Sequence, residues 1–499
     1  MVRAMASASF ASLVPSIGLA AARDEGTSSG IPDGVLESVR ERIRQGLIHG
    51  ESTGLAVAVV SGNQIVWEEG FGWADRETRQ RVTPHSPFSL QSVTKPFTTT
   101  LLTTFAAEGK LSLDQPANIY LGVSKIQGPN GNPEKVTVRL LGAHASGLPE
   151  TYEELYDGVP SPAPATFLSN YGKLAYPPGE IWEYSNVAFD ALGAIVANLT
   201  GADYGKLMSQ RVLTPLGLRD SFWDTDTARI AEGVARYDAA GKKIPFYLTT
   251  TPPSGELFAS AHDVARFAMW NMKIRLSDGS LLMNDHWIDE LQKPAFVGPS
   301  GATSTFGWAL DRLKSGKTVI HKGGGGAGVS TIVCMVPEQK LACVVLANHQ
   351  HAEKFTHSIC NQIFGSYLSD WTMPGENGEP PRRPFIMTDS MAGLWRGTLM
   401  NNGVTLPVQL DIRSSEVATL AVGSHAPEKL SHLGSEGPAF LGIAPGVIAS
   451  PEALRVGAKL LRVKVIQRED KLVGRITSQF GALDDPHATL PFVVSLSRA

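Results

Sequence analysis

The chain carries, ahead of a Thr- and Leu-rich run, the segment Phe88-Ser89-Leu90-Gln91-Ser92-Val93-Thr94-Lys95. Residues three apart lie on one face of a helix, so the Ser92 hydroxyl and the Lys95 amine can come within hydrogen-bonding distance. A serine hydroxyl is a weak nucleophile until a base takes its proton, and a lysine kept neutral by burial can be that base. The tetrad alone is a weak signal, because about one such match is expected by chance in a chain of 499 residues.

Two further motifs follow along the chain. The first is Tyr184-Ser185-Asn186, which stands before an amphipathic helical run that begins near Val187. Its phenol can relay a proton, and its amide can hold a lysine or a substrate carbonyl. The second is His321-Lys322-Gly323-Gly324 at the end of a strand-like run, where small residues let a substrate lie against the strand edge and expose backbone N–H groups.

The three motifs, in this order, resemble those of the penicillin-recognising serine hydrolases, which carry Ser-x-x-Lys, then Tyr-x-Asn, then a Lys-Thr-Gly-like triplet. Segments 136–149 and 255–263 are also similar to that family, and the resemblance covers roughly residues 35 to 370. Tyr-Ser-Asn in place of Ser-Asp-Asn points to the branch that holds class C β-lactamases, D-aminopeptidases of the S12 peptidase type and family VIII esterases.

The resemblance implies an α/β (α+β) fold of the β-lactamase/transpeptidase type. We expect an antiparallel sheet with helices on both faces and an inserted, mostly helical region from about residue 109 to 271. A helix near residues 33–45 and a hairpin of strands 55–60 and 64–73 should open the domain, and later strands should return to the same sheet. Ser92 then lies at the junction of sheet and helical region, where a cleft forms.

The third motif departs from the family pattern. His321 stands where most members have lysine, and the glycine run from residue 323 is one residue longer than usual. We expect His321 to be the functional residue, with Lys322 in a shifted register as the alternative and a structural strand-end histidine as a further one. Because the family lysine helps to bind the carboxylate of the antibiotic, we expect β-lactams to be poor substrates.

The resemblance implies a set of site residues: Ser92, Lys95, Tyr184, Asn186, His321, Gly323 and Gly324. Lys95, assisted by Tyr184, would draw the proton from Ser92 as it attacks a carbonyl, and the backbone N–H groups of Ser92 and Gly324 would bind the oxyanion. Asn186 would orient Lys95 and the substrate amide, and His321 would support Tyr184 or hold a substrate carboxylate. The chemistry needs no cofactor.

The expected function is that of a serine hydrolase with an acyl-Ser92 intermediate. We favour an S12-like peptidase that cleaves amide bonds in short peptides, including ones with D- or other unusual residues. A carboxylesterase of the family VIII type is the alternative, and a catalytically idle binding protein is a further one. An α/β-hydrolase mechanism would need Gly-x-Ser-x-Gly at a strand-to-helix turn, and no strand-to-helix turn predicted from the sequence carries that pattern.

Composition limits the partners. A net charge of −4 gives no basic surface for nucleic acid, and 42% hydrophobic residues suffice for packed cores. Residues 1–22, with Arg3 ahead of a small and apolar stretch, are typical of a signal peptide. The mature protein would then be periplasmic or secreted, without a membrane span; if the segment is instead a disordered extension, the protein is cytoplasmic.

The chain has three cysteines, too few for a disulfide framework. Strands 331–336 and 341–347 would set Cys334 opposite Cys343 in a hairpin. Buried free thiols are favoured over a bridge, because cross-strand bridges demand strained geometry. The histidines are scattered in sequence, so no metal site is expected.

The amino-acid composition of the chain changes after the hydrolase domain, which we place at residues 31–372. Residues 373–388, rich in Pro, Gly and charge, indicate a linker. Residues 389–499 alternate in short strands, which predicts an antiparallel β-barrel similar to the lipocalin-like domains of some S12 peptidases. We expect this domain to shape the cleft or to mediate a homo-oligomer rather than to bind its own ligand, and a chain ending near Trp371 to fold with changed substrate preference.

Overall fold

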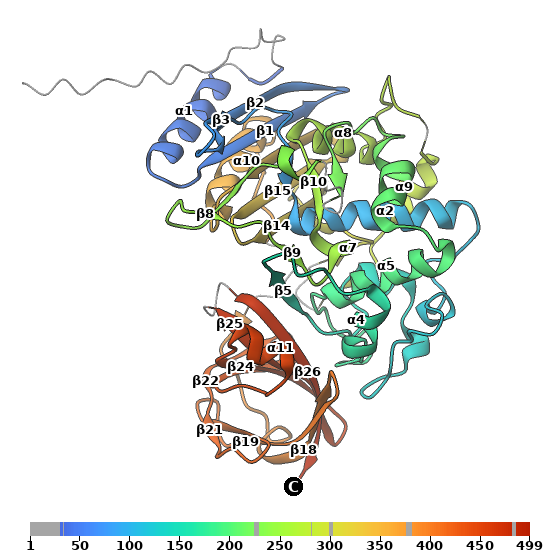
Figure 1. Cartoon of the computed structure of the whole chain (residues 1–499), viewed down its shortest axis with the longest axis vertical. Helices are drawn as coiled ribbons and strands as arrows, with labels where there is room; N and C mark the ends of the chain where they lie inside the picture. The colour runs from blue at the N-terminus through green and yellow to red at the C-terminus, as the bar shows by residue number, and fades with distance from the viewer. Residues whose placement is uncertain are drawn as a thin grey trace, which may run out of the picture.

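The computed structural model describes residues 30–32, 34–223, 229–280, 282–298, 303–375, 382–481 and 486–499. The predicted signal segment 1–22 lies outside these residues. Figure 1 shows a larger α/β body, coloured blue to light orange, above a smaller body of strands coloured orange to red.

The larger body is built on one antiparallel sheet of nine strands. In spatial order these are β11 (Phe296–Val297), β12 (Thr303–Ser304), β13 (Ala309–Arg312), β14 (Thr318–Gly326), β15 (Val329–Val336), β16 (Leu341–Ala347), β1 (Gly54–Ser61), β2 (Gln64–Asp75) and β3 (Gln80–Arg81). Because β16 pairs with β1, the late strands return to the sheet that the first hairpin begins, as predicted.

Side chains of this sheet alternate between two apolar cores, as the two-residue period of a strand requires. Ala56 and Ala58 of β1 pack into the core that holds α2 (Thr94–Ala107) and α8 (Ala261–Asn271). Val57 and Val59 pack into the opposite core with α1 (Val35–Ile48) and α10 (Glu353–Tyr367). The predicted arrangement of helices on both faces of an antiparallel sheet is therefore confirmed (Figure 1).

The inserted region lies beside α2. Its helices are α3 (Val138–Gly142), α4 (Pro164–Tyr171), α5 (Asn186–Thr200), α6 (Tyr204–Met208), α7 (Pro252–Gly255) and, further along, α9 (Asp285–Gln292). It also contains short strands that the sequence analysis did not separate: β5 (Tyr152–Leu155), β6 (Phe222–Trp223), β7 (Arg236–Tyr237), β8 (Lys243–Ile244), β9 (Leu248–Thr249) and β10 (Leu257–Ala259), which lies between β6 and β4 (Phe88–Ser89). Among the described helices, none combines the length and the apolar character that crossing a membrane would require.

The cysteines follow the predicted register. Cys334 of β15 lies opposite Cys343 of β16, and both thiols are free and buried. The third thiol, Cys360 of α10, is 3.4 Å from the Cys343 sulfur. The three cysteines are thus packing residues of the core shared with α1 and α10.

The smaller body is a single antiparallel sheet around its own apolar core. Its strands are, in spatial order, β17 (Arg382–Arg383), β22 (Ser431–Glu436), β23 (Ala439–Pro445), β24 (Leu460–Arg468), β25 (Lys471–Gly481), β26 (Pro486–Arg498), β18 (Gly393–Asn401), β19 (Val404–Ile412), β20 (Ala418–Val422) and β21 (Glu428–Lys429). One helix, α11 (Pro451–Val456), packs beside β25 and β26. The predicted strands are present, and β17 falls within the segment predicted to be a linker.

This sheet curls so that β21 comes next to β22, with only Leu430 between them in the chain (Figure 1). Among the described residues, no strand pairing joins β21 to β22. The antiparallel strands of the predicted β-barrel are present, and the described strand pairs include none that closes the barrel.

The two bodies share backbone pairing. Strand β26 of the smaller body pairs with β5 of the larger one, where Thr489 faces Tyr152 and Ala488 faces Glu153. Strand β5 in turn pairs with β9. Figure 1 shows β5 directly above the upper ends of β25 and β26. The smaller body is therefore joined to a sheet of the larger one by strand pairing, and not by the linker alone.

Candidate active site

Ser92 lies in a single 3₁₀ turn, Gln91–Val93, that leads into α2, and Lys95 is the second residue of that helix. Lys95 Nζ is 3.2 Å from Ser92 Oγ. Gln91, just before the serine, has a left-handed φ of 48°, a strained conformation for a residue with a side chain. The sharp turn lets Ser92 face the cleft while Lys95 remains within reach behind it.

Lys95 is fully buried. Its Nζ also lies 3.1 Å from the carbonyl oxygen of Ser254. Burial, followed by the nearby ammonium of Lys322, holds the pKa of Lys95 well below its ordinary value. Asp190 and Glu150 act in the opposite direction and do not reverse the shift. This setting favours the neutral form of the amine, whose lone pair can accept the Ser92 proton.

Tyr184 completes the contact with the nucleophile. Its hydroxyl is 2.5 Å from Ser92 Oγ. The Nζ atoms of Lys95 and Lys322 lie 4.8 and 5.1 Å from the centre of its ring. Ser185 positions the tyrosine, because its Oγ caps α5 by accepting from the N–H of Ala188 at 3.0 Å. The phenol therefore stands between the nucleophile and two amines, where it can pass a proton in either direction.

We expect Tyr184→Phe to slow acylation and deacylation, each by about 10²- to 10³-fold, because both steps need a proton relay at the Ser92 oxygen. Burst and steady-state kinetics on an activated ester separate the two steps. A Tyr184→Phe enzyme with unchanged rates would assign the relay to Lys95 alone. Tyr156→Phe, a phenol outside the cleft lining, is the matched control.

His144 supports Tyr184, and sequence reasoning did not select it. Its ring stacks on the Tyr184 ring with centroids 4.4 Å apart, and its Nδ1 accepts from the N–H of Ser185 at 3.1 Å. Burial, with the charges of Lys322 and Lys95, holds the pKa of His144 well below its ordinary value, so the ring is neutral. The sequence signal that could have identified His144 is its position in segment 136–149, which is similar to the family. The sequence analysis used that segment only to support the resemblance.

At the third motif, the geometry favours Lys322, the alternative, over the expected His321. On β14, His321 lies opposite Cys334, which belongs to the core with α1 and α10, and its Nε2 is 2.9 Å from Asp311 Oδ2. Lys322 lies opposite Val333, which belongs to the core with α2, and its Nζ reaches the Tyr184 ring. Neighbouring residues of a strand point to opposite faces, so only one of the two can reach the site.

The same one-residue shift applies to the glycines. Gly324 packs against the Ser92 turn, where a Cβ would come within 2.3 Å of the Leu90 carbonyl oxygen and 3.1 Å of the Ser92 nitrogen. Thr331 fixes this approach by donating to the same carbonyl at 2.9 Å. Gly325 and Gly326, rather than the predicted Gly323 and Gly324, line the cleft beside Ser92.

Asn186 is the first residue of α5, but its partner differs from the expected one. Its Nδ2 donates to the carbonyl oxygen of Thr151 at 2.7 Å. The hydrogen bonds recorded for the described residues include none between Asn186 and Lys95. Its Oδ1 is buried without a partner, and the residue lines the cleft. The side chain thus anchors the segment leading into β5 and offers an acceptor to a bound molecule.

The cleft is a cavity of about 250 Å³. It is lined by Gln91, Ser92, Glu150, Tyr152, Tyr184, Asn186, Thr249, Ser254, Gly325, Gly326, Gln350, His351, Glu353 and Thr489. Thr489 comes from β26, so the smaller body forms part of the wall. No local pattern marks residues such as Glu150, His351 and Thr489, which only the tertiary fold brings to the same cavity as Ser92.

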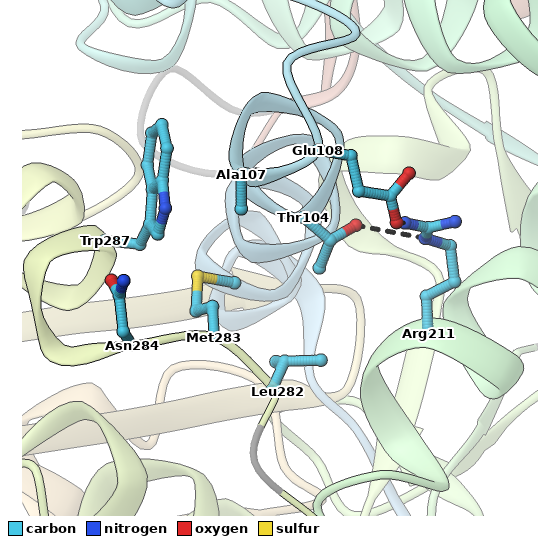
Figure 2. Close-up of a pocket in the computed structure, with 8 residues that line it drawn as sticks. All are labelled: Thr104, Ala107, Glu108, Arg211, Leu282, Met283, Asn284 and Trp287. Atoms are coloured by element: carbon cyan, nitrogen blue, oxygen red, sulfur yellow. Dashed lines mark hydrogen bonds and ion pairs between the residues drawn. The ribbon is translucent and has the colours of Figure 1, made fainter.

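A second pocket opens near the other end of α2 (Figure 2). Its charged groups are already paired, since Arg211 forms an ion pair with Glu108 and donates to Thr104 Oγ1 at 3.1 Å. The remaining lining includes Leu282, Met283 and Trp287. This pocket offers no nucleophile and base, so we do not assign the chemistry to it.

The fold also gathers Glu68, His85 and His262, whose ligand-type atoms all lie within 4.8 Å of one another. Sequence spacing does not reveal this group. His262 Nδ1 is 2.8 Å from Glu68 Oε2, and His85 Nδ1 is 2.7 Å from Asp220 Oδ2. The first contact joins the start of α8 to β2, and both histidines thus already have a carboxylate partner.

Sequence comparison identifies relatives over the larger body. The family model described as Beta-lactamase matches residues 39–358. Protein flp of Staphylococcus aureus (strain NCTC 8325 / PS 47) is 24% identical over 333 residues, which cover 64% of this chain and 65% of that protein. A Beta-lactamase of Pseudomonas fluorescens is 27% identical over 363 residues, which cover 62% of this chain and 93% of that protein.

Solved structures share the fold. D-alanine carboxypeptidase AmpC from Burkholderia cenocepacia is 24% identical and covers 67% of this chain and 99% of its own, with a TM-score of 0.56. The octameric penicillin-binding protein homologue from Pyrococcus abyssi is 19% identical and covers 92% and 100%, with a TM-score of 0.57. SurE with D-Leu is 20% identical and covers 91% and 99%, with a TM-score of 0.61. The last two likenesses extend over the smaller body.

Proposed function

This chain belongs to the beta-lactamase family, and from that premise we propose that it is a serine hydrolase that works through an acyl-Ser92 intermediate. One observation carries the proposal. The Ser92 hydroxyl lies in a cleft, 2.5 Å from the Tyr184 hydroxyl and 3.2 Å from the amine of Lys95, whose pKa is lowered by burial. A nucleophile, a base and a proton relay thus meet at one point.

In the proposed reaction, Lys95 takes the Ser92 proton, directly or through Tyr184, as Ser92 Oγ bonds to the substrate carbonyl carbon. Tyr184 then protonates the leaving amine or alcohol, and the acyl group remains on Ser92. Water next gives a proton to Tyr184 and attacks the acyl carbon. As the bond between that carbon and Ser92 Oγ breaks and the acid leaves, Lys95 returns its proton to Ser92 Oγ and restores the hydroxyl. Every proton therefore passes between atoms that already lie within about 3 Å of Ser92 Oγ.

The oxyanion would be bound by backbone N–H groups at the cleft edge. We assign Ser92 and Gly325 to this role, because the glycine run of β14 passes against the Ser92 turn and Gly325 lines the cavity. Two preorganised donors of this kind are worth several kcal/mol in a transition state. The sequence analysis assigned the Gly324 N–H to the oxyanion. The one-residue shift of the third motif moves that role to Gly325.

For the substrate we favour amide bonds in short peptides, including ones with D- or other unusual residues. The fold likeness to a D-alanine carboxypeptidase and to SurE, a protein whose structure was solved with D-Leu, supports this choice. The wall contributed by Thr489 supports a size-limited, small-peptide cleft. A carboxylesterase of the family VIII type is the second candidate, and an idle binding protein is the third.

Labelling with a fluorophosphonate tests whether the site is active. We expect stoichiometric modification of Ser92, identified by peptide mass spectrometry, and loss of labelling in Ser92→Ala. Intact, folded protein that takes up no label at Ser92 would favour the idle binding protein.

A comparison of substrates separates peptidase from esterase. We expect measurable kcat/KM on short peptide amides, higher values on the matching esters because an ester is the easier acyl donor, and low values on a chromogenic cephalosporin. Ester turnover with undetectable cleavage across a varied peptide library would instead support the carboxylesterase. The expectation for the cephalosporin no longer rests on His321, since Lys322 fills that place. It rests on the acidic lining of the cleft, because Glu150 and Glu353 would face the carboxylate of the drug.

We also infer a homo-oligomer from the likeness to an octameric homologue that covers both bodies. Light scattering coupled to size-exclusion chromatography would measure the mass directly. Export to the periplasm or beyond remains our proposal for the N-terminal segment, and N-terminal sequencing of the mature protein tests it.

A further inference from the structure

We propose that the part of the cleft formed by Glu150, Asn186 and Thr489 binds the protonated amino group of the acyl donor. The enzyme would then act on amino acid and peptide derivatives that carry a free amino end, as an aminopeptidase does. The proposal rests on the proposed serine hydrolase and names its substrate class. It rests on the charge and the hydrogen-bonding capacity of the residues that line the cavity, and on the contribution of Thr489 by the smaller body.

The charge of the lining favours a cation. The described lining residues include two carboxylates, those of Glu150 and Glu353, and neither a lysine nor an arginine. Glu150 keeps about a third of its side chain exposed, and its Oε2 is 3.4 Å from Arg475 Nη2. Arg475 itself forms its closest contact with Glu183, behind the cleft wall. A carboxylate group of a substrate would be repelled here, whereas an ammonium group would be attracted.

The hydrogen-bonding capacity of the lining also favours a donor. Asn186 Oδ1, Thr249 Oγ1 and Thr489 Oγ1 are buried and have no partner. The Asn186 oxygen can only accept, because the Nδ2 atom is held by the carbonyl of Thr151. Buried polar atoms in folded proteins are almost always paired, so unpaired ones at a cavity point to a ligand or water that fills it. An ammonium group brings three N–H donors to such a surface.

The position of Thr489 is fixed by backbone contacts between the two bodies. Its carbonyl oxygen accepts from Thr151 Oγ1 at 2.8 Å, and its strand pairs with Tyr152. Thr151 is the residue whose carbonyl holds Asn186. One short segment, residues 150–152, therefore joins the carboxylate, the amide and the hydroxyl into one subsite. The smaller body closes the cleft at the end where the ammonium would lie.

The test uses matched substrates that differ only at the amino group: alanine methyl ester and alanine p-nitroanilide of either hand, each against its N-acetyl derivative. We expect kcat/KM to be at least about tenfold higher for the free amines, in keeping with the contribution of a partly buried charge pair. Their KM should rise above about pH 8, where an α-amino group loses its proton, while that of the N-acetyl series should not.

Variants assign the effect to the subsite. Glu150→Gln should lower kcat/KM about tenfold for the free amines and change the N-acetyl series by less than about twofold. Thr489→Val should act in the same direction with a smaller effect. Glu469→Gln, an exposed carboxylate of the smaller body, is the control. An equal loss on both series would mean that Glu150 acts through Lys95 or through stability, and would overturn the proposal.

The outcomes separate this proposal from the proposed peptidase activity. A free-amine preference that holds for esters, with inert anilides, would keep the subsite and reject the peptidase. Cleavage of N-acetyl anilides at equal or higher kcat/KM would keep the hydrolase and reject the subsite. If neither series is turned over, the thermal unfolding midpoint still decides. Alaninamide should raise it and N-acetylalaninamide should not, and equal shifts or none would reject the subsite.

Discussion

Ser92→Ala is expected to abolish turnover, with kcat/KM falling by about 10⁴-fold or more, because it removes the hydroxyl that lies 2.5 Å from the Tyr184 hydroxyl and 3.2 Å from Lys95 Nζ. Lys95→Met should be nearly as severe, since the Ser92 hydroxyl then has no neutral amine to take its proton. The double variant should be no slower than Ser92→Ala. Groups that act as one unit do not contribute additively.

The measurement is steady-state kinetics on an activated ester, with fluorophosphonate labelling as a second readout. Ser89→Ala is the matched control, because its buried hydroxyl lies in the preceding strand and has no hydrogen-bond partner. Retention of even a tenth of the wild-type rate by Ser92→Ala would show that the nucleophile has been assigned to the wrong residue. Additive losses in the double variant would mean that Lys95 and Ser92 serve different steps.

Arg475→Met is expected to lower the free energy of unfolding by about 3 kcal/mol, because it leaves the buried carboxylate of Glu183 short of a partner. Glu183 is 1% exposed and also pairs with Lys464, whose Nζ lies 2.7 Å from Glu183 Oε2. That remaining pair places the effect at the lower end of the range for broken buried ion pairs. Turnover should fall as well, since Glu183 directly precedes Tyr184.

The pH dependence of this loss has a definite sign. Arg475 and Lys464 overcome the effect of burial and hold the pKa of Glu183 below its ordinary value in the folded protein. The wild-type protein therefore loses this contribution as the pH falls through the lowered pKa. In Arg475→Met the pKa of Glu183 should rise, so protonation relieves the buried charge sooner. The stability difference between the two proteins should thus be larger at pH 7 than at pH 4.

Urea unfolding at the two pH values measures the difference. Arg413→Met, on an exposed arginine of the smaller body, is the control and should change stability by less than about 0.5 kcal/mol. Equal stability of wild type and Arg475→Met at pH 7 would show that Lys464 alone compensates Glu183. If stability is unchanged but turnover is slower, the role of Arg475 would be limited to positioning the segment that carries Tyr184.

The same contact changes the expectation for a chain that ends near Trp371. Such a chain would leave Glu183 without Arg475 and Lys464. It would also expose Tyr176 and Ile181, which pack against Val473 and Val493. We now expect the shortened chain to be poorly folded. Its substrate preference would then say little about the cleft, and single substitutions such as Thr489→Val are the better test.

Local rules were enough to predict the contact between Ser92 and Lys95 and the main sheet. The Ser92 and Lys95 contact follows from a spacing of three residues, and the opposition of Cys334 and Cys343 follows from a short hairpin. Both depend on residues close in sequence, where helix and strand periods leave little choice.

The third motif shows where local rules end. His321 and Lys322 are adjacent, and a shift of one residue in strand register exchanges the face that each occupies. The sequence pattern does not fix that register, whereas the pairing of β14 with β15 does. Thr489 could not be predicted as a cleft residue for another reason. The pairing of β26 with β5, far apart in sequence, places it in the lining of the same cavity as Ser92.

That pairing of β26 with β5 also limits how the molecule can move. Two domains that meet at a flexible hinge can swing apart to admit a substrate, but a shared backbone ladder must break hydrogen bonds to do so. Thr489 and Tyr152 lie on this ladder and on the cleft wall at once. We therefore expect the entrance to keep its width when a substrate binds, so that size alone should decide which molecules reach Ser92 and no opening step should slow their exit.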